Sequence, residues 1–349
     1  MLKPLIRELI DRADRWLLPL AAANRWSASV YYLLFSRQFR REHRAVLAGR
    51  LAYYRGLERP LHSSPLLRRN VHRLEKGLVM RPRAPSFAAD YIGETVDELA
   101  RLRTAGQLEA AEDKWAGDVL DEYFAVVRDT PPIEQARVRY GALTAAQEHH
   151  GSQRSVPQPR ASWPAAPVSY DDFLALCRRR RSVRWFESRP VPRELVVRAL
   201  DAAAQAPSAG NRQPFMFRYL EEADDAHRIA AIAMGTTGYA GNIPALVVLL
   251  GDLSCYPAER DRHVVYIDAS LAAMQFMLAL ETLGLASCPI NWPDVESLER
   301  QMARELKLPW HLRPVMLIAV GYADPAGGIP YSAKKPAAAL LRDRNDYAP

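Results

Sequence analysis

The chain has 349 residues, of which 49% are hydrophobic and 25% charged, the composition of an ordinary soluble globular protein. Its three cysteines show no metal-ligand spacing, which argues against a disulfide framework, favours a cytoplasmic location and predicts no bound metal. The net charge of +7 is uneven: residues 1–83 hold 18 lysines and arginines against 6 acids, and residues 84–150 hold 6 against 13. The basic excess is therefore a local surface property, and we expect no nucleic-acid binding.

The first 147 residues have the apolar spacing of helices, and we predict a helical N-terminal domain over residues 1–147. The apolar stretch Trp16–Ala23 is short and is broken by Pro19. We therefore expect neither a signal peptide nor a membrane span. The helical spacing is clearest in residues 2–17, 29–54, 87–102 and 113–127.

Aromatic side chains are interleaved with the basic residues of the first 83 positions. A basic, aromatic and amphipathic helix is typical of a membrane-surface segment. It is also suited to docking on the acidic segment that follows, because the two charges are complementary. We favour docking and keep a peripheral membrane contact as the alternative. Within this region His72, Glu75 and Lys76 fall on one helical face, either as a small polar site or as a solvated face.

A proline-rich segment over residues 148–168 holds four prolines and separates the helical domain from a second domain over residues 169–349. In the second domain, apolar runs and Pro or Gly punctuation predict further elements. The longest of these helices is apolar on all sides, so we expect it to be buried, in part against a partner subunit. The predicted helices are 170–181, 192–207, 266–284 and 297–308, and the predicted strands are 245–250 and 314–322.

Four arginines end the first of these helices, in the stretch RRRRSVRWF from Arg178 to Phe186. Cations at a helix C-terminus are favoured by the helix dipole, which is the simplest interpretation. The alternative is a phosphate site, since the planar guanidinium donates two hydrogen bonds at once.

Two motifs in a fixed order connect this stretch with a known family. RRSVRWF (Arg180–Phe186) is followed by APSAGNRQPFMF (Ala206–Phe217), and then by NIPALVVLLGD, the long apolar helix, RPVMLIAVGY and the basic tail SAKKP. This order resembles the nitroreductase family of flavin enzymes over residues 169–344. The resemblance does not cover the first 165 residues.

The resemblance implies an α+β fold, with a central, mostly antiparallel sheet flanked by helices, to which the apolar spacing of residues 1–147 adds an N-terminal helical extension. It also implies FMN as the cofactor, with the arginine segment and the basic tail near its phosphate. We expect Arg180 and Arg184 to serve the phosphate and the ring edge between them, and Ser182 to donate to the ribityl chain or the phosphate. The residues implied at this end of the cofactor are Arg180, Arg181, Ser182, Arg184, Lys334 and Lys335.

The loop PSAGNRQP supplies the second half of the implied site. Its short side chains let the backbone approach a flat ring, and its amides offer donors and acceptors. In the family this loop reaches the FMN from the second subunit, so the resemblance implies a homodimer. Taken alone, the stretch is an ordinary turn. The implied contacts are Pro207, Ser208, Ala209, Asn211 and Gln213.

The stretch CPINWP lies where the family places the backbone that faces flavin N5, which makes Pro289, Ile290 and Asn291 implied cofactor contacts. The family often has an acid followed by glycine here, whereas this chain has Asn291 and Trp292. Trp292 either fills part of the substrate pocket or packs in the core. Tyr239 either lines the same pocket or is a loop tyrosine with a solvated hydroxyl.

No Ser/His/Asp set stands out, and the resemblance requires none, because flavin N5 carries the chemistry. It implies an FMN-dependent oxidoreductase that moves hydride between NADH or NADPH and a nitroaromatic, a quinone or a pathway metabolite, by a ping-pong mechanism. No GxGxxG follows a strand, so the nicotinamide would be a visiting substrate. The alternatives are a flavin-dependent dehydrogenase or oxidase of one metabolite, and a non-redox flavin-binding module whose N-terminal helices mediate membrane or protein association.

Overall fold

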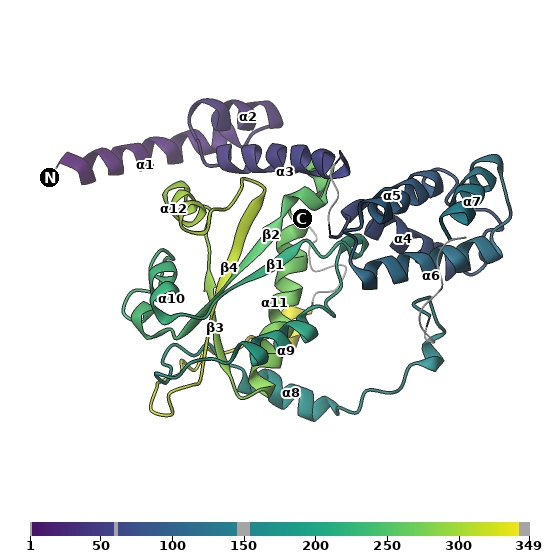
Figure 1. Ribbon diagram of the computed structural model, residues 1–349. Coiled ribbons are helices and arrows are strands. Elements are labelled where there is room, and N and C mark those ends of the chain that lie inside the picture. The colour runs from purple at the N-terminus through teal and green to yellow at the C-terminus, as the bar shows by residue number, and fades with distance from the viewer. Residues whose placement is uncertain (1, 59–61, 145–153, 342–349) are drawn as a thin grey trace.

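A computed structural model describes residues 2–58, 62–144 and 154–341 of the chain, with the backbone alone for residues 2–11 (Figure 1). The first part is helical and contains α1 (Leu2–Ala21), α2 (Arg25–Leu34), α3 (Arg40–Glu58), α4 (Pro65–Leu78), α5 (Ile92–Ala105), α6 (Ala110–Val126) and α7 (Pro131–Thr144). The second part contains α8 (Tyr170–Arg179), α9 (Arg193–Ala203), β1 (Phe215–Leu220), α10 (Ala223–Ala230), β2 (Ala245–Asp252), α11 (Val264–Thr282), β3 (Ala286–Asn291), α12 (Glu296–Leu306), β4 (Leu312–Gly321) and α13 (Ala337–Leu340).

The strands form one antiparallel sheet in the order β1-β2-β4-β3, and helices cover both of its faces (Figure 1). The α+β fold with a central antiparallel sheet is therefore confirmed. In the central pair, Val247 lies opposite Ile318 and Val248 opposite Leu317. Burial of both faces explains why β2 and β4 are continuous apolar runs and do not alternate with polar residues.

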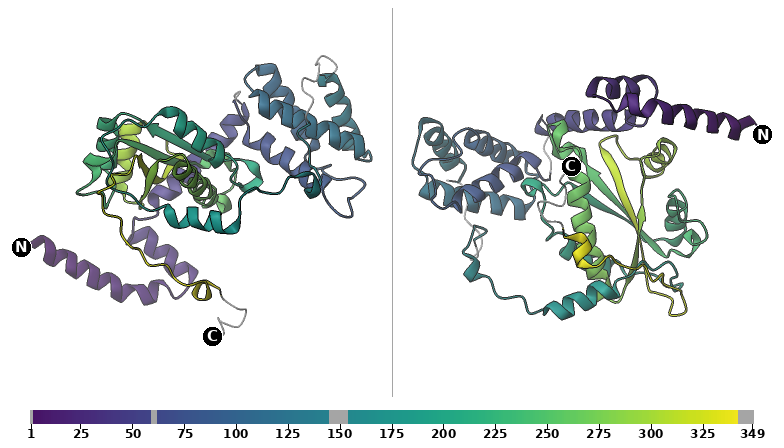
Figure 2. Two further views of the ribbon diagram at one scale, coloured as in Figure 1. Left: turned by 90° about the horizontal axis from the view of Figure 1, so that it is seen from below. Right: turned by 180° about the vertical axis from the view of Figure 1, so that it is seen from behind.

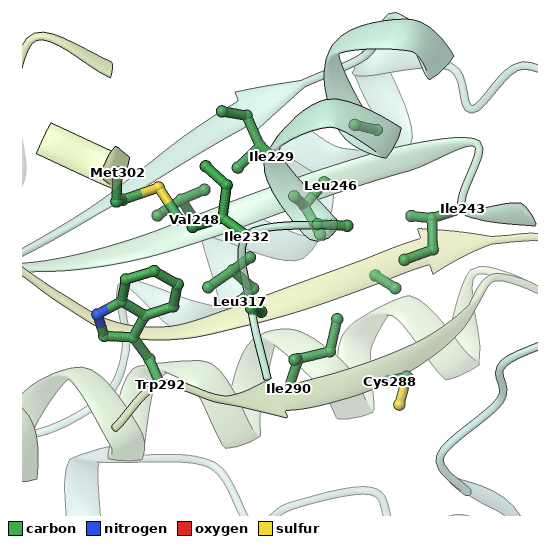
Figure 3. Packing of buried hydrophobic residues seen from close by; sticks show 14 of the residues in the cluster. Ile229, Ile232, Ile243, Leu246, Val248, Cys288, Ile290, Trp292, Met302 and Leu317 are labelled. Atoms are coloured by element: carbon green, nitrogen blue, oxygen red, sulfur yellow. The ribbon is translucent and has the colours of Figure 1, made fainter. Parts of the chain in front are cut away.

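Successive side chains of β2 enter two different cores because a strand directs them to opposite faces. Leu246 and Val248 pack with Met302 of α12 and with α10, and Figure 3 shows this cluster from close by. Val247 and Leu249 pack on the other face, against α9 and α11. The sheet is thus the middle layer between two layers of helices, with the longest helix, α11, on one side.

The predicted elements of the second domain are found within a few residues of their expected bounds. The strands expected at 245–250 and 314–322 are β2 and β4, and the expected helices are α8, α9, α11 and α12. Ser169 caps α8 by accepting a hydrogen bond from the Asp172 N–H at 3.1 Å, and Gly284 has a left-handed φ of 78° just after α11. Strand β3 was not predicted, because it contains Pro289 and proline is rare within strands. The structure places β3 at the edge of the sheet, where a proline is tolerated.

Helices α3 to α7 belong to two separate cores. Helices α4 to α7 share one buried cluster around Leu74, Leu99 and Tyr123. Helix α3 instead packs its Ala45 and Val46 against residues of the second domain, beyond β2. The boundaries 1–147, 148–168 and 169–349 remain predictions, and residues 145–153 of this region lie outside the described chain.

Only part of the basic region docks on the acidic segment as expected. Helix α4 does so, and α3 does not. Arg68 pairs with Glu112 of α6 at 2.8 Å. On α3, however, Arg41 pairs with Glu296 of α12 at 2.5 Å, so the basic residues of this helix face the second domain. Among the described helices, α11 with the residues before it is long and apolar enough to span a membrane, yet it packs against α9 and the sheet.

The contact of α3 with the second domain depends on a glycine, which gives a stability prediction. A Cβ atom at Gly49 would lie 2.6 Å from Leu253 Cβ, whereas a Cβ at Gly141 of α7 would meet nothing within 4 Å. We expect Gly49→Ala to lower the free energy of unfolding by about 1–3 kcal/mol through overpacking. We expect Gly141→Ala to raise it by about 0.5–1 kcal/mol, because alanine restricts the unfolded chain. Denaturant unfolding measures both, and equal effects of the two variants would contradict the close contact.

Candidate flavin site

The arginine segment leaves α8 and runs beside the start of β3. Arg180 follows the helix with an extended backbone, and its N–H still donates to the Leu176 carbonyl. Ser182 then pairs in parallel with Ser287, and the Val183 N–H donates to the Ser287 carbonyl at 3.1 Å. Two segments that the sequence singles out separately, 180–184 and 287–291, are thereby held side by side.

The arginines of this segment have different surroundings. Arg178 is exposed, and Arg179 pairs with Glu281 of α11 at 2.9 Å, as expected for cations at a helix end. Arg181 donates to the carbonyls of Pro330 and Tyr331, at 2.6 Å for Pro330. It therefore fastens the C-terminal tail to the arginine segment.

Arg180 and Ser287 carry buried polar atoms without a protein partner. The Nε of Arg180 and the Oγ of Ser287 are both shielded from solvent, and neither makes a hydrogen bond with a described residue. Buried donors are nearly always hydrogen-bonded in proteins. A ligand with acceptor oxygens at this position would satisfy both groups, and the anionic phosphate of FMN has such oxygens.

Tyr239 and Cys288 lie near Arg184, the last arginine of the segment. The guanidinium carbon of Arg184 is 5.8 Å from the centroid of the Tyr239 ring. Burial raises the pKa of the Tyr239 hydroxyl, and this half-buried side chain packs against the core cluster, while its place in a substrate pocket stays a prediction. Burial also raises the pKa of the Cys288 thiol, so the thiol stays protonated at neutral pH and has the character of a small apolar side chain.

The loop Pro207–Gln213 has an irregular backbone with three residues at positive φ. Gly210, Asn211 and Gln213 have positive φ values of 66°, 53° and 52°. Asparagine tolerates this left-handed conformation, whereas for glutamine it is costly, and such strained residues cluster at functional sites. The Gln213 N–H donates to Ser208 Oγ at 3.0 Å, and Gln213 Nε2 donates to Asn211 Oδ1 at 3.1 Å. Local hydrogen bonds thus hold the amide side chains that the sequence predicts to be functional.

Two side chains from other elements fix this loop, and sequence reasoning missed both. Asp268 of α11 is buried and accepts a hydrogen bond from the Ala209 N–H at 2.9 Å and one from the Tyr256 hydroxyl at 3.2 Å. Burial raises the pKa of this carboxyl. Arg68 of α4 donates through Nε to the Asn211 carbonyl at 2.8 Å. The signal for Asp268 in the sequence is an acid within an otherwise apolar helix.

The segment after Cys288 divides between the sheet and the core. Pro289 and Ile290 lie in β3 opposite Ile318 and Leu317, and Asn291 is exposed at its end. Trp292 is buried in the cluster of Figure 3, and its indole N–H donates to Glu299 Oε1 at 2.9 Å. This placement favours the core-packing alternative for Trp292 over a place in a substrate pocket.

The remaining candidates lie at the edges of the site. Lys334 and Lys335 are exposed on the tail whose residues Pro330 and Tyr331 contact Arg181. On α4, His72 Nδ1 lies 3.0 Å from Glu75 Oε2, and the Trp115 indole donates to Glu75 Oε1 at 2.9 Å. That face is therefore a paired polar cluster in the helical bundle and not simply a solvated face, although Lys76 is exposed.

Within one chain, the loop and the arginine segment lie at opposite ends of α11. The loop is bound to Asp268 near the start of the helix, and Arg179 is bound to Glu281 near its end. Thirteen residues of helix separate these anchors, roughly 20 Å at 1.5 Å per residue. Figure 1 shows α8 at the lower end of α11, far from the contact between the loop and α4. Among the described residues, no group of His, Cys, Asp or Glu side chains could hold a metal ion.

The second domain of the chain is similar to proteins of one known family. The nitroreductase family model matches residues 177–241 and 221–322. A Methanothermobacter thermautotrophicus protein with the provisional name NADH dehydrogenase/NAD(P)H nitroreductase is 30% identical over 164 residues, which cover 44% of this chain and 79% of that protein. Human iodotyrosine deiodinase 1 is 25% identical, covering 47% of this chain and 66% of its own length. The solved FMN-dependent nitroreductase of Clostridium difficile R20291 is 24% identical and covers 46% of this chain and 92% of that one, with a TM-score of 0.40.

These matches support a flavin-type oxidoreductase as the class of protein. The chain belongs to the nitroreductase family. The family match begins at residue 177, so the helices α1 to α7 lie outside it.

The anchoring of the loop by Asp268 can be tested through stability. Asp268→Ala leaves the Ala209 N–H and the Tyr256 hydroxyl without their acceptor, and we expect it to cost about 1–3 kcal/mol of unfolding free energy. The matched variant Asp268→Asn keeps an acceptor oxygen, so its cost should be clearly smaller. Denaturant unfolding compares the two, and equal losses would show that these hydrogen bonds do not hold the loop.

Proposed function

We propose that this protein is a homodimeric, FMN-dependent oxidoreductase that transfers hydride between NADH or NADPH and a small organic acceptor. The observation that carries the proposal is the pair of buried atoms without a described partner, Arg180 Nε and Ser287 Oγ, in the arginine segment and in the start of β3 beside it. Bound FMN would supply hydride transfer through its N5 atom.

The residues of the arginine segment would contact different parts of the cofactor. Arg180 would donate to the phosphate, and Ser182, fixed by its backbone pairing with β3, would donate to the phosphate or the ribityl chain. Arg184 lies near Tyr239, and its positive charge would lie beside the edge of the flavin ring. Lys334 and Lys335 add positive charge on the tail that Arg181 fastens.

The homodimer is supported by the distance between the two halves of the site. Because the loop Pro207–Gln213 and the arginine segment lie roughly 20 Å apart along α11, one cofactor contacts both only if the loop comes from a second subunit. Helix α11 also exposes an apolar stripe at the i, i+4 and i+7 positions Ile267, Leu271 and Met274. We propose that this stripe is buried in the dimer.

The substrate side of the proposed site is bounded by Tyr239 and by the β3 backbone from Pro289 onward. With Trp292 turned into the core, its side chain does not occupy this side. The acceptor would be a nitroaromatic, a quinone or a metabolite that stacks on a flat ring, and the nicotinamide would use the same space in turn. A flavin-dependent dehydrogenase or oxidase would use the same residues in the opposite direction.

The role of Arg180 is testable by cofactor binding. We expect Arg180→Ala to weaken FMN binding at least roughly tenfold, since a charge-assisted hydrogen bond contributes about 1.5–3 kcal/mol. The matched control is Arg178→Ala, two residues earlier, where the side chain is exposed at the helix end. Titration of the apoprotein with FMN, followed by quenching of flavin fluorescence, measures both affinities. Equal affinities for the two variants would contradict a phosphate site at Arg180.

The shared pocket predicts the kinetic pattern. If nicotinamide and acceptor occupy the same side of the cofactor in turn, initial rates at several fixed acceptor concentrations should give parallel double-reciprocal lines against NADH or NADPH. A quinone is a convenient acceptor for this assay. Converging lines would mean that both substrates bind together, and a single shared pocket would then be wrong.

A further inference from the structure

Helices α1 and α2 expose large apolar side chains that no other part of the described chain covers. No side chain of α2 is buried. Trp16 is 79% exposed, Trp26 70% and Leu33 69%. The exposed set includes Trp16, Leu20, Trp26, Leu33, Leu34 and Phe35. Apolar patches of this kind mark interaction surfaces, since a soluble surface seldom gathers so many in one place.

The two helices are joined to each other more firmly than to the body of the protein. The Tyr31 hydroxyl donates to Asp14 across the pair, and Asn24 caps α2 by accepting from the N–H groups of Trp26 and Ser27. Figures 1 and 2 show α1 extending away from the sheet domain in each view. Helices without a buried face are marginal in water, so packing beyond that seen among the described residues would stabilise them.

Arginines flank this apolar surface at the start of α3. Arg37, Arg40 and Arg44 make no ion pair with any acidic side chain that the structure describes. Arg44 and Arg41 lie over the Trp310 ring, with guanidinium carbons 3.8 and 4.6 Å from its centroid. Two adjoining clefts of about 520 and 460 Å³ meet at Arg41 and Trp310. The start of α3 therefore presents open space lined by cations and an aromatic ring.

The acids around these clefts are already paired, so they do not neutralise the free arginines. Glu296 pairs with Arg41 at 2.5 Å and with Arg300 at 3.3 Å. Glu42 pairs with Arg262 at 3.5 Å, and Asp294 pairs with the buried Arg313. The surface as a whole thus combines exposed tryptophans and leucines with uncompensated positive charge.

We propose that α1, α2 and the arginines at the start of α3 form a docking surface for a bilayer that contains anionic phospholipids. Apolar and aromatic side chains insert at the boundary between headgroups and acyl chains, and arginines beside them bind the lipid phosphates.

A second copy of the chain fits less well, because a symmetric contact would bring the same uncompensated arginines together. Within one chain the acidic helices α5 to α7 do not cover this surface, since α1 and α2 lie apart from them in both figures. The surface holds neither of the proposed flavin-binding segments, so this proposal does not rest on the proposed function.

Vesicle flotation of the full-length protein tests this surface. We expect the protein to float with vesicles of phosphatidylcholine and phosphatidylglycerol, to float far less with phosphatidylcholine alone, and to be released by salt. Inorganic phosphate should not displace it beyond the effect of equal ionic strength, which separates a bilayer from a free anion. Failure to float with anionic vesicles would overturn the proposal.

Matched variants assign the binding to these residues. Leu33→Ser with Phe35→Ser should weaken vesicle binding roughly tenfold or more through lost apolar burial. The control pair, Val138→Ser with Val197→Ser, changes exposed apolar residues of α7 and α9 and should leave binding unchanged. Arg40→Gln with Arg44→Gln should abolish the preference for anionic lipid, whereas Arg160→Gln with Arg218→Gln should not.

Circular dichroism and the oligomeric state of each variant complete the test. If the Leu33 and Phe35 variant is folded and still floats like the wild type, α2 is not the docking element and the proposal fails. If that variant instead changes the oligomeric state of the protein without any vesicle binding by the wild type, the surface is an interface between copies of this chain, which also overturns the proposal.

Discussion

One backbone hydrogen bond, from the Val183 N–H to the Ser287 carbonyl, joins the two segments on which the proposed flavin site depends. It turns the end of α8 along the edge strand β3 and brings Arg180 and Ser182 next to the backbone that continues to Ile290. The cost is two buried polar atoms, Arg180 Nε and Ser287 Oγ, to which no group among the described residues forms a hydrogen bond. An anionic, oxygen-rich ligand removes that cost, which is why cofactor binding and the local fold are linked in this account.

The long helix α11 sets the second constraint, because it separates the loop from the arginine segment within one chain. Near its start, Asp268 holds the loop, and near its end Glu281 holds the arginine helix. A helix cannot bring its two ends together, which is why we propose that the two halves of one site come from two subunits. The same helix offers the apolar stripe through which those subunits would meet. In this proposal, the assembly and the site both depend on α11.

Much of the second domain could be predicted from the sequence, because its signals are local. Continuous apolar runs predict β2 and β4, and prolines and glycines mark where α9 and α11 begin and end. Only some residues of the candidate site could be predicted from the sequence. The order of the motifs indicated Arg180, Ser182 and the loop, whereas Asp268 and Arg68 act through contacts 59 and 143 residues away in the sequence. No periodicity reports such contacts, and the placement of Trp292 in the core likewise depends on Glu299, on the following helix.

An absorption spectrum of the purified protein, recorded before and after anaerobic addition of NADH or NADPH, tests the central claim most directly. The account predicts the bands of an oxidised flavin, in the protein as isolated or after reconstitution with FMN, and their bleaching by the reduced nicotinamide. A colourless protein that takes up no FMN would contradict the assignment of the buried Arg180 and Ser287 atoms to a flavin phosphate. A yellow protein that neither nicotinamide bleaches would contradict the proposed NAD(P)H-dependent activity while leaving the flavin site intact.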